Sequence, residues 1–535
     1  MLKKCNVQSF WRKNFLRGKK LISISFIMIL ITLITRIIGF VREEVIAYFF
    51  GTTYISDAVK ISTYIPLTIS HLLVAGLLSA IFIPVFTDFL VSKKNQDMWE
   101  TFNILFNVIG LIFIILSIFF FVFAKELIHL MAPSASTSMK NLAKIIFIYL
   151  IPQILILAWA SLLTGLHNTY ESFITPAIGG VLYNLSIVFS LIFLVKYFEA
   201  YAIIYGALFG ATLQFVILIP FAKKMGWKYR FIFNIKNPYV KKIGALAVPI
   251  LINSTFGYIT PIFEKSIGSS FGEGAISSLD YSFKVSQLPL GIFAFVISLV
   301  IYPKLSQLVS KNEIERLKRT IQFGLRFILY LMIPSSFGLI LLSFPIIRLL
   351  FQQGMFGGAS TLMVSNLLIF YSIGLPFWGM TSLLVRVFYS FKDTITPVII
   401  SILTILIQIS LYFVNSKLIG LSGIPLGASI ASILQFTLLF YFLNKKIKNL
   451  DFKEFLLRFS LISTYSIIAV FISFYISKYF DKNGLTVSKL GQIYQVGIAI
   501  IVTLIIYFLI LFIRDYKEIR LEMERIRGEI NEKVK

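Results

Sequence analysis

The stretch FNILFNVIGLIFIILSIFFFVF, residues 102–123, contains no charged side chain. A helix that crosses a membrane needs roughly 20 predominantly apolar residues, so this stretch predicts one spanning helix. Comparable runs recur along the chain and predict an all-α polytopic membrane protein with about fourteen transmembrane helices. The predicted runs lie near residues 21–41, 60–90, 102–123, 142–165, 174–195, 200–221, 241–263, 280–303, 321–344, 362–386, 396–414, 419–443, 456–479 and 490–513.

The composition agrees with lipid as the main solvent of the chain. Hydrophobic residues make up 58% of the 535 positions and charged residues only 14%, whereas soluble domains are nearer a quarter charged. The net charge of +26 comes from Lys and Arg in short segments between the apolar runs, so no nucleic-acid partner is expected. The run over residues 21–40 is too long for the core of a signal peptide and predicts the first helix.

The distribution of Lys and Arg predicts the orientation in the membrane. Basic residues gather after the second, sixth, eighth and twelfth predicted helices, while the connections over residues 51–56 and 268–278 contain none. Because cytoplasmic loops carry an excess of Lys and Arg, both termini are predicted to be cytoplasmic, in a multi-pass protein of the bacterial cytoplasmic (inner) membrane. The charged tail, residues 514–535, is expected to be a solvated helix, with a partner-binding role as the alternative.

The chain repeats itself at one constant offset. Ser161-Leu162-Leu163 recurs as Ser382-Leu383-Leu384, and Phe50-Gly51 recurs as Phe271-Gly272. The offset spans six predicted helices, so the two halves have the same orientation, with a cavity expected between them. The predicted organisation is a basic cytoplasmic leader (1–20), a first six-helix lobe (21–222), a cytoplasmic linker (223–240), a second six-helix lobe (241–444), two further helices (445–513) and the tail (514–535).

Ionisable residues at membrane depth are expensive and mark candidate transport pathways. In the first predicted helix, Arg36 and Arg42 are expected near one face, two turns apart. The alternative is that both side chains reach the membrane interface and bind nothing.

The second predicted helix places Asp57, Lys60, Tyr64 and His71 along one stripe. Asp57 and Lys60 are candidate ligand-binding residues, or a pair that neutralises itself. His71 is a candidate site residue or a satisfied interior histidine.

Two further ionisable residues lie in the following half. Lys284, in the eighth predicted helix, corresponds to the charged face of the second. Glu264, in the seventh, is a candidate for binding a coupling ion, with pairing to Lys265 as the alternative. A cavity with Arg36, Arg42, Lys60 and Lys284 suits an anion, and arginine donates two hydrogen bonds to phosphate, so a lipid-linked pyrophosphate fits.

The motifs exclude several classes of protein. The sequence contains no Walker loop, metal-ligand cluster or nucleophile elbow, so a transporter is expected rather than an enzyme or an ATP-driven pump. No cofactor and no metal site are expected, and coupling to the membrane potential, sodium or protons remains open. Helix-breaking prolines at Pro66, Pro84, Pro289 and Pro303 predict bends in the second and eighth helices.

Motifs in a consistent order span both predicted lobes. They include Arg36-Ile37-Ile38-Gly39-Phe40-Val41-Arg42-Glu43, Asp57-Ala58, Pro84-Val85-Phe86, Gln287-Leu288-Pro289-Leu290-Gly291 and Lys392-Asp393-Thr394. Together they resemble the MurJ/MviN family. The resemblance implies two six-helix lobes of the multidrug/oligosaccharidyl-lipid/polysaccharide exporter superfamily, with two C-terminal helices that form a hydrophobic groove. It also implies that Arg36, Arg42 and Lys284 are basic cavity residues and that Asp57 is an acidic one.

One part of the second helix departs from the family pattern. Where the family usually has an arginine pair and then a glutamate, this chain has Ser70, His71 and Ala75. Lys60 is extra and lies on the same stripe, and Gln408 takes the place of a carboxylate in the eleventh helix. The departures predict a rearranged pyrophosphate site or a different substrate.

The resemblance implies a flippase that moves lipid II, the undecaprenyl-pyrophosphate-linked peptidoglycan precursor, across the inner membrane by alternating access for cell-wall synthesis. Lipid II, membrane lipids and the cell-wall synthesis machinery are the expected partners. The alternatives are a flippase for another polyprenyl-linked glycan, a multidrug exporter of the same superfamily, and a non-transporting scaffold homologue.

Overall fold

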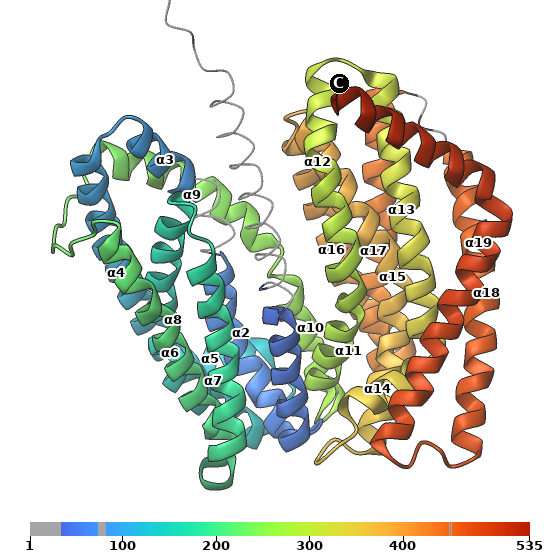
Figure 1. Cartoon of the computed structure of the whole chain (residues 1–535). Helices are drawn as coiled ribbons and strands as arrows, with labels where there is room; N and C mark the ends of the chain where they lie inside the picture. Colours follow the sequence, from blue (N-terminus) through green and yellow to red (C-terminus); the bar gives the residue numbers. More distant parts are fainter. Residues whose placement is uncertain (1–30, 32–33, 73–81, 449, 451, 535) are drawn as a thin grey trace, which may run out of the picture. The chain divides into compact units, whose positions relative to one another are not determined.

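The computed structural model describes residue 31 and residues 34–72, 82–448, 450 and 452–534, and all regular elements in these ranges are helices (Figure 1). This confirms the predicted all-α class. Nine helical stretches of the described ranges are long and apolar enough to cross a membrane. They are Asn95–Val122, Thr137–Thr169, Ile174–Lys224, Ala275–Ser310, Ile314–Leu341, Gly358–Ser390, Ile395–Ile447, Phe452–Lys482 and Lys489–Arg514.

The count of about fourteen spans stays a prediction. Three of the nine stretches each contain two successive helices, and the basic leader and most of the first predicted helix lie outside the described residues. The described part of the first helix covers residues 34–50, so this helix continues beyond its predicted end near residue 41.

The chain divides into two compact units, Met1–Gly274 and Ala275–Lys535. The first unit contains, after the helix over residues 34–50, the helices α2 (Tyr54–Leu72), α3 (Ile83–Val91), α4 (Asn95–Val122), α5 (Ala124–Met131), α6 (Thr137–Thr169), α7 (Ile174–Phe198), α8 (Ala202–Lys224), α9 (Pro238–Phe256) and α10 (Thr260–Gly268). In this unit α9 packs against α2 and α4, and α10 packs against α5. The unit defined by contacts ends at Gly274, which is not where the sequence places the start of the second lobe. The lobe boundary at residue 241 stays a prediction.

The second unit contains the remaining helices. They are α11 (Ala275–Pro289), α12 (Phe295–Ser310), α13 (Ile314–Leu341), α14 (Ser343–Phe351), α15 (Gly358–Ser390), α16 (Ile395–Ile419), α17 (Gly423–Ile447), α18 (Phe452–Lys482) and α19 (Lys489–Val534). The last two helices pack side by side, and α18 also contacts α13 (Figure 1). The helical form of the predicted tail is confirmed, because α19 continues to Val534.

The internal repeat appears in the lengths of the helices. α6 and α15 each have 33 residues, and α7 and α16 each have 25, with starting residues 221 positions apart in both cases. The turns repeat as well. Glu199 and Gly420 lie at corresponding positions, with positive φ angles of 46° and 67°. Because a left-handed backbone favours glycine, Glu199 holds a less favourable conformation than Gly420.

Two short helices, α5 and α14, were absent from the sequence prediction. They have 8 and 9 residues, far below the length of a spanning helix. They occupy equivalent places in the repeat, directly after α4 and α13.

The proline in α11 produces the predicted local break. Pro289 ends α11, and a π-helical turn over Leu290–Ala294 follows before α12 begins. A π turn leaves the regular hydrogen-bond ladder and bends the helix.

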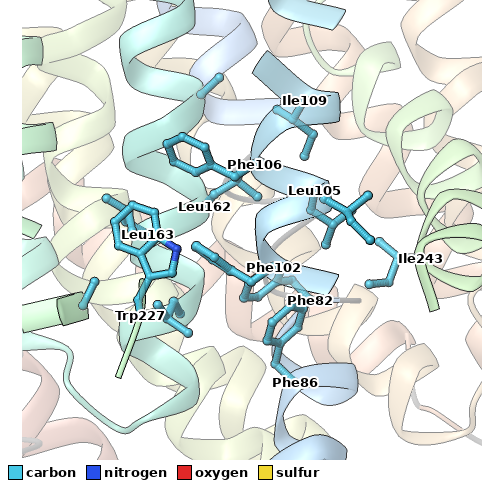
Figure 2. Packing of buried hydrophobic residues seen from close by; sticks show 14 of the residues in the cluster. Phe82, Phe86, Phe102, Leu105, Phe106, Ile109, Leu162, Leu163, Trp227 and Ile243 are labelled. Carbon is cyan, nitrogen blue, oxygen red and sulfur yellow. The ribbon is translucent and has the colours of Figure 1, made fainter. Parts of the chain in front are cut away.

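The core of the first unit is built around aromatic side chains from α4. Phe102 and Phe86 are fully buried and pack edge to face, with ring centroids 6.1 Å apart, and Trp227 closes the cluster 5.6 Å from Phe102 (Figure 2). Aromatic pairs in this geometry contribute about 0.5–1.5 kcal/mol beyond their buried area. The cluster fixes α4 against the loop that follows α8.

The pair α7 and α8 packs closely because small residues face each other. A Cβ atom on Gly206 would lie 2.7 Å from both Ile187 Cα and Ser190 Cβ, and a Cβ on Gly210 would lie 2.8 Å from the Tyr183 carbonyl oxygen. Small residues four apart allow helix backbones to approach in membranes, where packing replaces the hydrophobic effect as the driving force.

Replacing Gly206 with alanine is expected to lower the stability by about 1–3 kcal/mol, since the added methyl group meets backbone atoms that must shift. Gly338→Ala is the matched control, because no atom lies within 4 Å of the added Cβ. The apparent melting temperature of the detergent-solubilised protein, measured by size exclusion after heating, should fall only for G206A. Equal melting temperatures for the two variants would contradict this description of the packing.

Candidate functional site

Three charged side chains of the first unit, Arg42, Glu43 and Lys60, form a cluster around the Glu43 carboxylate. Its carboxylate accepts hydrogen bonds from Arg42, with Arg42 Nη2 2.6 Å from Oε1, and its other oxygen pairs with Lys60 from α2. The Glu43 and Lys60 side chains are 4% and 5% exposed. A carboxylate buried this deeply needs cationic partners, and Lys60 and Arg42 supply them.

The helix over residues 34–50 runs beside α7, and this contact orients Arg42. Arg42 Nη1 donates to Asn184 Oδ1 at 3.0 Å, while Asn184 Nδ2 donates to the Gly180 carbonyl at 2.9 Å. The two helices are in direct contact here, since Cβ atoms on Gly39 and Gly180 would lie within van der Waals distance of Asn184 Oδ1 and Thr35 Cγ2, at 3.8 and 3.6 Å. The guanidinium is therefore held from two sides, by an amide and by a carboxylate.

Arg36 is exposed, in contrast to the partly buried Arg42. The expectation that the two arginines share a face is wrong. Six residues of an α-helix advance the direction of the side chain by about 600°, which leaves Arg36 and Arg42 about 120° apart.

Asp57 binds the backbone of Gly274, the last residue of the first unit. Its Oδ2 atom accepts a hydrogen bond from the Gly274 N–H at 2.7 Å, and the side chain is buried. Gly274 has a φ angle of +81°, and a Cβ there would lie 2.1 Å from the Thr52 carbonyl oxygen, so this position requires glycine. The stripe residue Asp57 therefore has a structural partner.

The rest of the stripe on α2 follows the same side of the helix. Tyr64 donates to the Tyr258 carbonyl at 2.8 Å, and Lys265 Nζ lies 4.8 Å from the centroid of the Tyr64 ring, which is a cation–π contact. Glu264, the candidate for ion coupling, is partly buried on α10. His71 is exposed in the last turn of α2.

Lys284 belongs to the second unit and lies on α11. Its Nζ atom pairs with Asp280 Oδ2 at 2.7 Å, one turn away on the same helix. Of the other positions at which the sequence departs from the family pattern, Ala75 lies outside the described residues, and Gln408 Nε2 donates to the Tyr412 hydroxyl at 2.5 Å.

The motif residue Asp393, in the turn before α16, lies outside the predicted spans. Burial raises the pKa of this carboxyl group, but hydrogen bonds from Lys446 Nζ at 2.6 Å and from the Thr396 amide and hydroxyl outweigh burial and lower the pKa below its ordinary value. Asp393 therefore contributes stability above its ordinary pKa that is lost as the pH falls through the lowered value.

Sequence reasoning missed Glu43 and Asn184 as members of the charged cluster. Glu43 lay within a motif used only for the resemblance, and its separation of 17 residues from Lys60 gave no local signal. One indication of a buried charge cluster was present in the sequence: residues of opposite charge, Arg42 and Glu43, stand next to each other in an apolar helix, and the next helix carries Lys60.

Known proteins match this chain along most of its length. The family described as "Lipid II flippase MurJ" matches residues 46–510. The "Probable lipid II flippase MurJ" of Rickettsia prowazekii is 29% identical over 485 residues, covering 89% of this chain and 95% of the relative. The protein of the same description from Buchnera aphidicola subsp. Baizongia pistaciae is 32% identical over 444 residues, covering 79% and 82%.

Solved structures agree with the sequence relatives. A structure titled "Lipid II flippase MurJ, inward closed conformation" has a TM-score of 0.78 and 27% identity, covering 92% of this chain and all of that chain. An inward-facing multidrug resistance MATE transporter of the MOP superfamily has a TM-score of 0.66 at 14% identity, which is a likeness of fold alone, over 77% and 94% of the two chains.

The chain shares its helical fold with a solved transporter and its sequence with a family of transporters, so the protein is a membrane transporter rather than an enzyme. The match over residues 46–510 identifies the family within that class: the chain belongs to the lipid II flippase MurJ family. The recognised resemblance is thereby confirmed.

A double-mutant cycle tests the cluster at Glu43. Glu43→Gln removes the carboxylate that pairs with both Arg42 and Lys60 and should destabilise the protein by about 3–5 kcal/mol. Lys60→Met should cost less, because Glu43 keeps its ion pair with Arg42. The double variant should lose less than the sum of the two, measured as apparent melting temperatures in detergent. Additive losses would show that Glu43 and Lys60 do not depend on each other.

The Asp57 contact is tested with two substitutions of different chemistry. Asp57→Ala leaves the Gly274 N–H without its acceptor and should cost about 1–3 kcal/mol, whereas Asp57→Asn retains an oxygen acceptor and should stay close to the parent. Melting temperature and transport activity are both measured. A variant D57N that melts as early as D57A would show that the charge, and not the acceptor, stabilises this position.

Proposed function

We propose that this chain is a flippase that moves lipid II across the inner membrane in cell-wall synthesis. The match of residues 46–510 to the lipid II flippase family carries the proposal. The curated relatives are described as lipid II flippases or probable lipid II flippases, so transport of another polyprenyl-linked glycan is not favoured.

The charged cluster supports a site for the pyrophosphate of lipid II. Arg42 of this cluster offers a guanidinium that Asn184 already orients. The exposed Arg36 points about 120° away around the same helix, so it would contact the head group from another side. Arginine binds phosphate oxygens in a two-bond geometry. In this proposal Glu43 is the internal counter-ion that keeps Arg42 and Lys60 charged while the site is empty, and the arriving pyrophosphate replaces Glu43 as a partner of Arg42.

The remaining candidates have secondary roles in this proposal. Asp57 holds the backbone at Gly274 and so positions α2, which carries Lys60. Lys284, which Asp280 neutralises in part, and the exposed His71 would contact the head group as alternating access exposes it to the other side.

The membrane potential is the proposed driving force. An inside-negative potential favours outward movement of each negative charge by about 2.3 kcal/mol per 100 mV, so the pyrophosphate needs no accompanying cation for a directional bias. Glu264 is the proposed residue for any additional coupling to sodium or protons. Lys and Arg gather after the second, sixth, eighth and twelfth helices predicted from the sequence, which supports cytoplasmic termini. The cell-wall synthesis machinery is the proposed protein partner.

Arg36→Ala is expected to abolish lipid II flipping while leaving insertion intact, because the guanidinium is exposed and makes no hydrogen bond or ion pair with the residues that the structure describes. Arg319→Ala, which removes an exposed arginine at the start of α13, is the matched control. Cells depleted of their own flippase express each variant, and an impermeant toxin that cleaves lipid II reports its arrival on the outer face.

Cleavage products should appear with the parent chain and R319A and be lost with R36A at an equal level of membrane protein. Full cleavage with R36A would overturn the assignment of Arg36. An absence of products with the parent chain, folded in the membrane, would overturn lipid II as the substrate.

A further inference from the structure

An apolar groove of about 690 Å³ opens on the first unit beside the loop between α8 and α9. Its volume is in the range of cavities that hold small molecules. Two loop residues at its edge are strongly exposed, with Phe231 at 79% and Tyr229 at 56%. Residues from three helices and the loop form the walls, among them Phe106, Ile114, Trp159, Phe215, Tyr229 and Phe231.

The floor of the groove is a tryptophan that lies over a glycine. The Trp159 indole stacks on the Phe106 ring with centroids 5.3 Å apart and planes 5° apart, and its Nε1 donates to the Phe106 carbonyl at 3.2 Å. A Cβ atom on Gly110 would lie 3.0 Å from Trp159 Nε1. Glycine therefore lets the indole lie flat, and the groove is shaped by packed side chains from α4 and α6.

Two asparagines of α4 hold the loop that forms the other wall. Asn103 donates to the Lys228 carbonyl at 3.1 Å and accepts from the Arg230 N–H at 3.1 Å. Asn107 donates to the carbonyls of Arg230 and Ile232 at 3.2 and 3.0 Å. Irregular backbone at the depth of a membrane must have its polar groups satisfied by the protein, and these bonds do so.

Basic side chains lie at one end of the groove. A second cavity of about 420 Å³ shares Trp227 and Tyr229 with the groove and is lined by Lys223 and Lys228, both exposed. Trp227 also packs beside Phe106, with ring centroids 5.5 Å apart (Figure 2). The apolar groove therefore ends at the ammonium groups of Lys223 and Lys228. This arrangement suits a molecule that has an apolar chain and an anionic head group.

The position along α4 places the groove in one leaflet. The first turns of α4, from Asn95, are polar, and the apolar run starts near Phe102. At 1.5 Å per residue, the wall from Phe106 to Ile114 lies roughly 6 to 18 Å into a hydrocarbon layer about 30 Å thick. The basic rim lies at the polar end, where lipid head groups are found.

We propose that this groove binds an anionic phospholipid of the surrounding leaflet, with an acyl chain along the aromatic walls and its phosphate at Lys223 and Lys228. The exposed aromatic residues of the loop lie at the membrane interface, where Tyr and Trp gather. Charge complementarity selects an anionic head group over a zwitterionic one. The occupant is a structural lipid of the bilayer, and its site shares no residue with the charged cluster at Glu43.

The test uses the full-length chain in nanodiscs of phosphatidylcholine that contain a trace of phosphatidylglycerol with a photoactivatable diazirine at the end of one acyl chain. After illumination, peptide mass spectrometry locates the label. We expect label on the peptides around Ile114 and Phe215, and competition by unlabelled phosphatidylglycerol but not by added phosphatidylcholine.

Two double variants with the same change in charge separate the site from general attraction to the membrane. Lys223→Gln with Lys228→Gln should weaken competition by phosphatidylglycerol about tenfold, while Lys241→Gln with Lys242→Gln, on α9, should leave it unchanged. Label spread evenly over the apolar surface, or unchanged competition in K223Q/K228Q, would overturn the proposal. Competition by undecaprenyl phosphate and not by phosphatidylglycerol would also overturn it, by assigning the groove to a polyprenyl chain.

Discussion

The requirement that peptide groups find hydrogen-bond partners without water determines the rest of this structure. Lipid offers no donors or acceptors, so a chain that crosses it must satisfy its backbone internally, and helices do this within one segment. The same requirement explains the exceptions. The π-helical turn over Leu290–Ala294 stays within a helical element. In the irregular loop after α8, backbone groups form hydrogen bonds with the side chains of Asn103 and Asn107.

Hydropathy predicted the long helices well because each carries a signal of about twenty residues. It could not detect α5 and α14, whose few apolar residues resemble the end of a preceding span. It also ended the first helix too early, near residue 41, because Arg42, Glu43 and Glu44 look like the start of a polar connection. The helix continues to residue 50, and within it Glu43 pairs with Arg42 and Lys60 rather than with water.

The candidate site shows a second limit of sequence reasoning. Ionisable residues in apolar runs can be listed from the sequence, and Arg42, Asp57 and Lys60 were found in this way. Their pairing depends on which helices are neighbours, and a sequence shows neither the contact between Arg42 and Asn184, 142 positions apart, nor that between Asp57 and Gly274. A count of basic residues therefore described the cluster as more positive than it is, since Glu43 offsets one of its cations.

Asn103 and Asn107 bind the backbone of the loop in the way that peptide units of a neighbouring strand would. A primary amide carries the same pair of functions as a peptide unit, one carbonyl acceptor and N–H donors, and these two side chains bind every second residue of the loop, at positions 228, 230 and 232. That spacing is the pattern that the edge of a β-sheet offers to an added strand. The helix α4 thus acts as a substitute for a sheet edge, and a protein made only of helices in its described ranges recognises an extended segment as a sheet would.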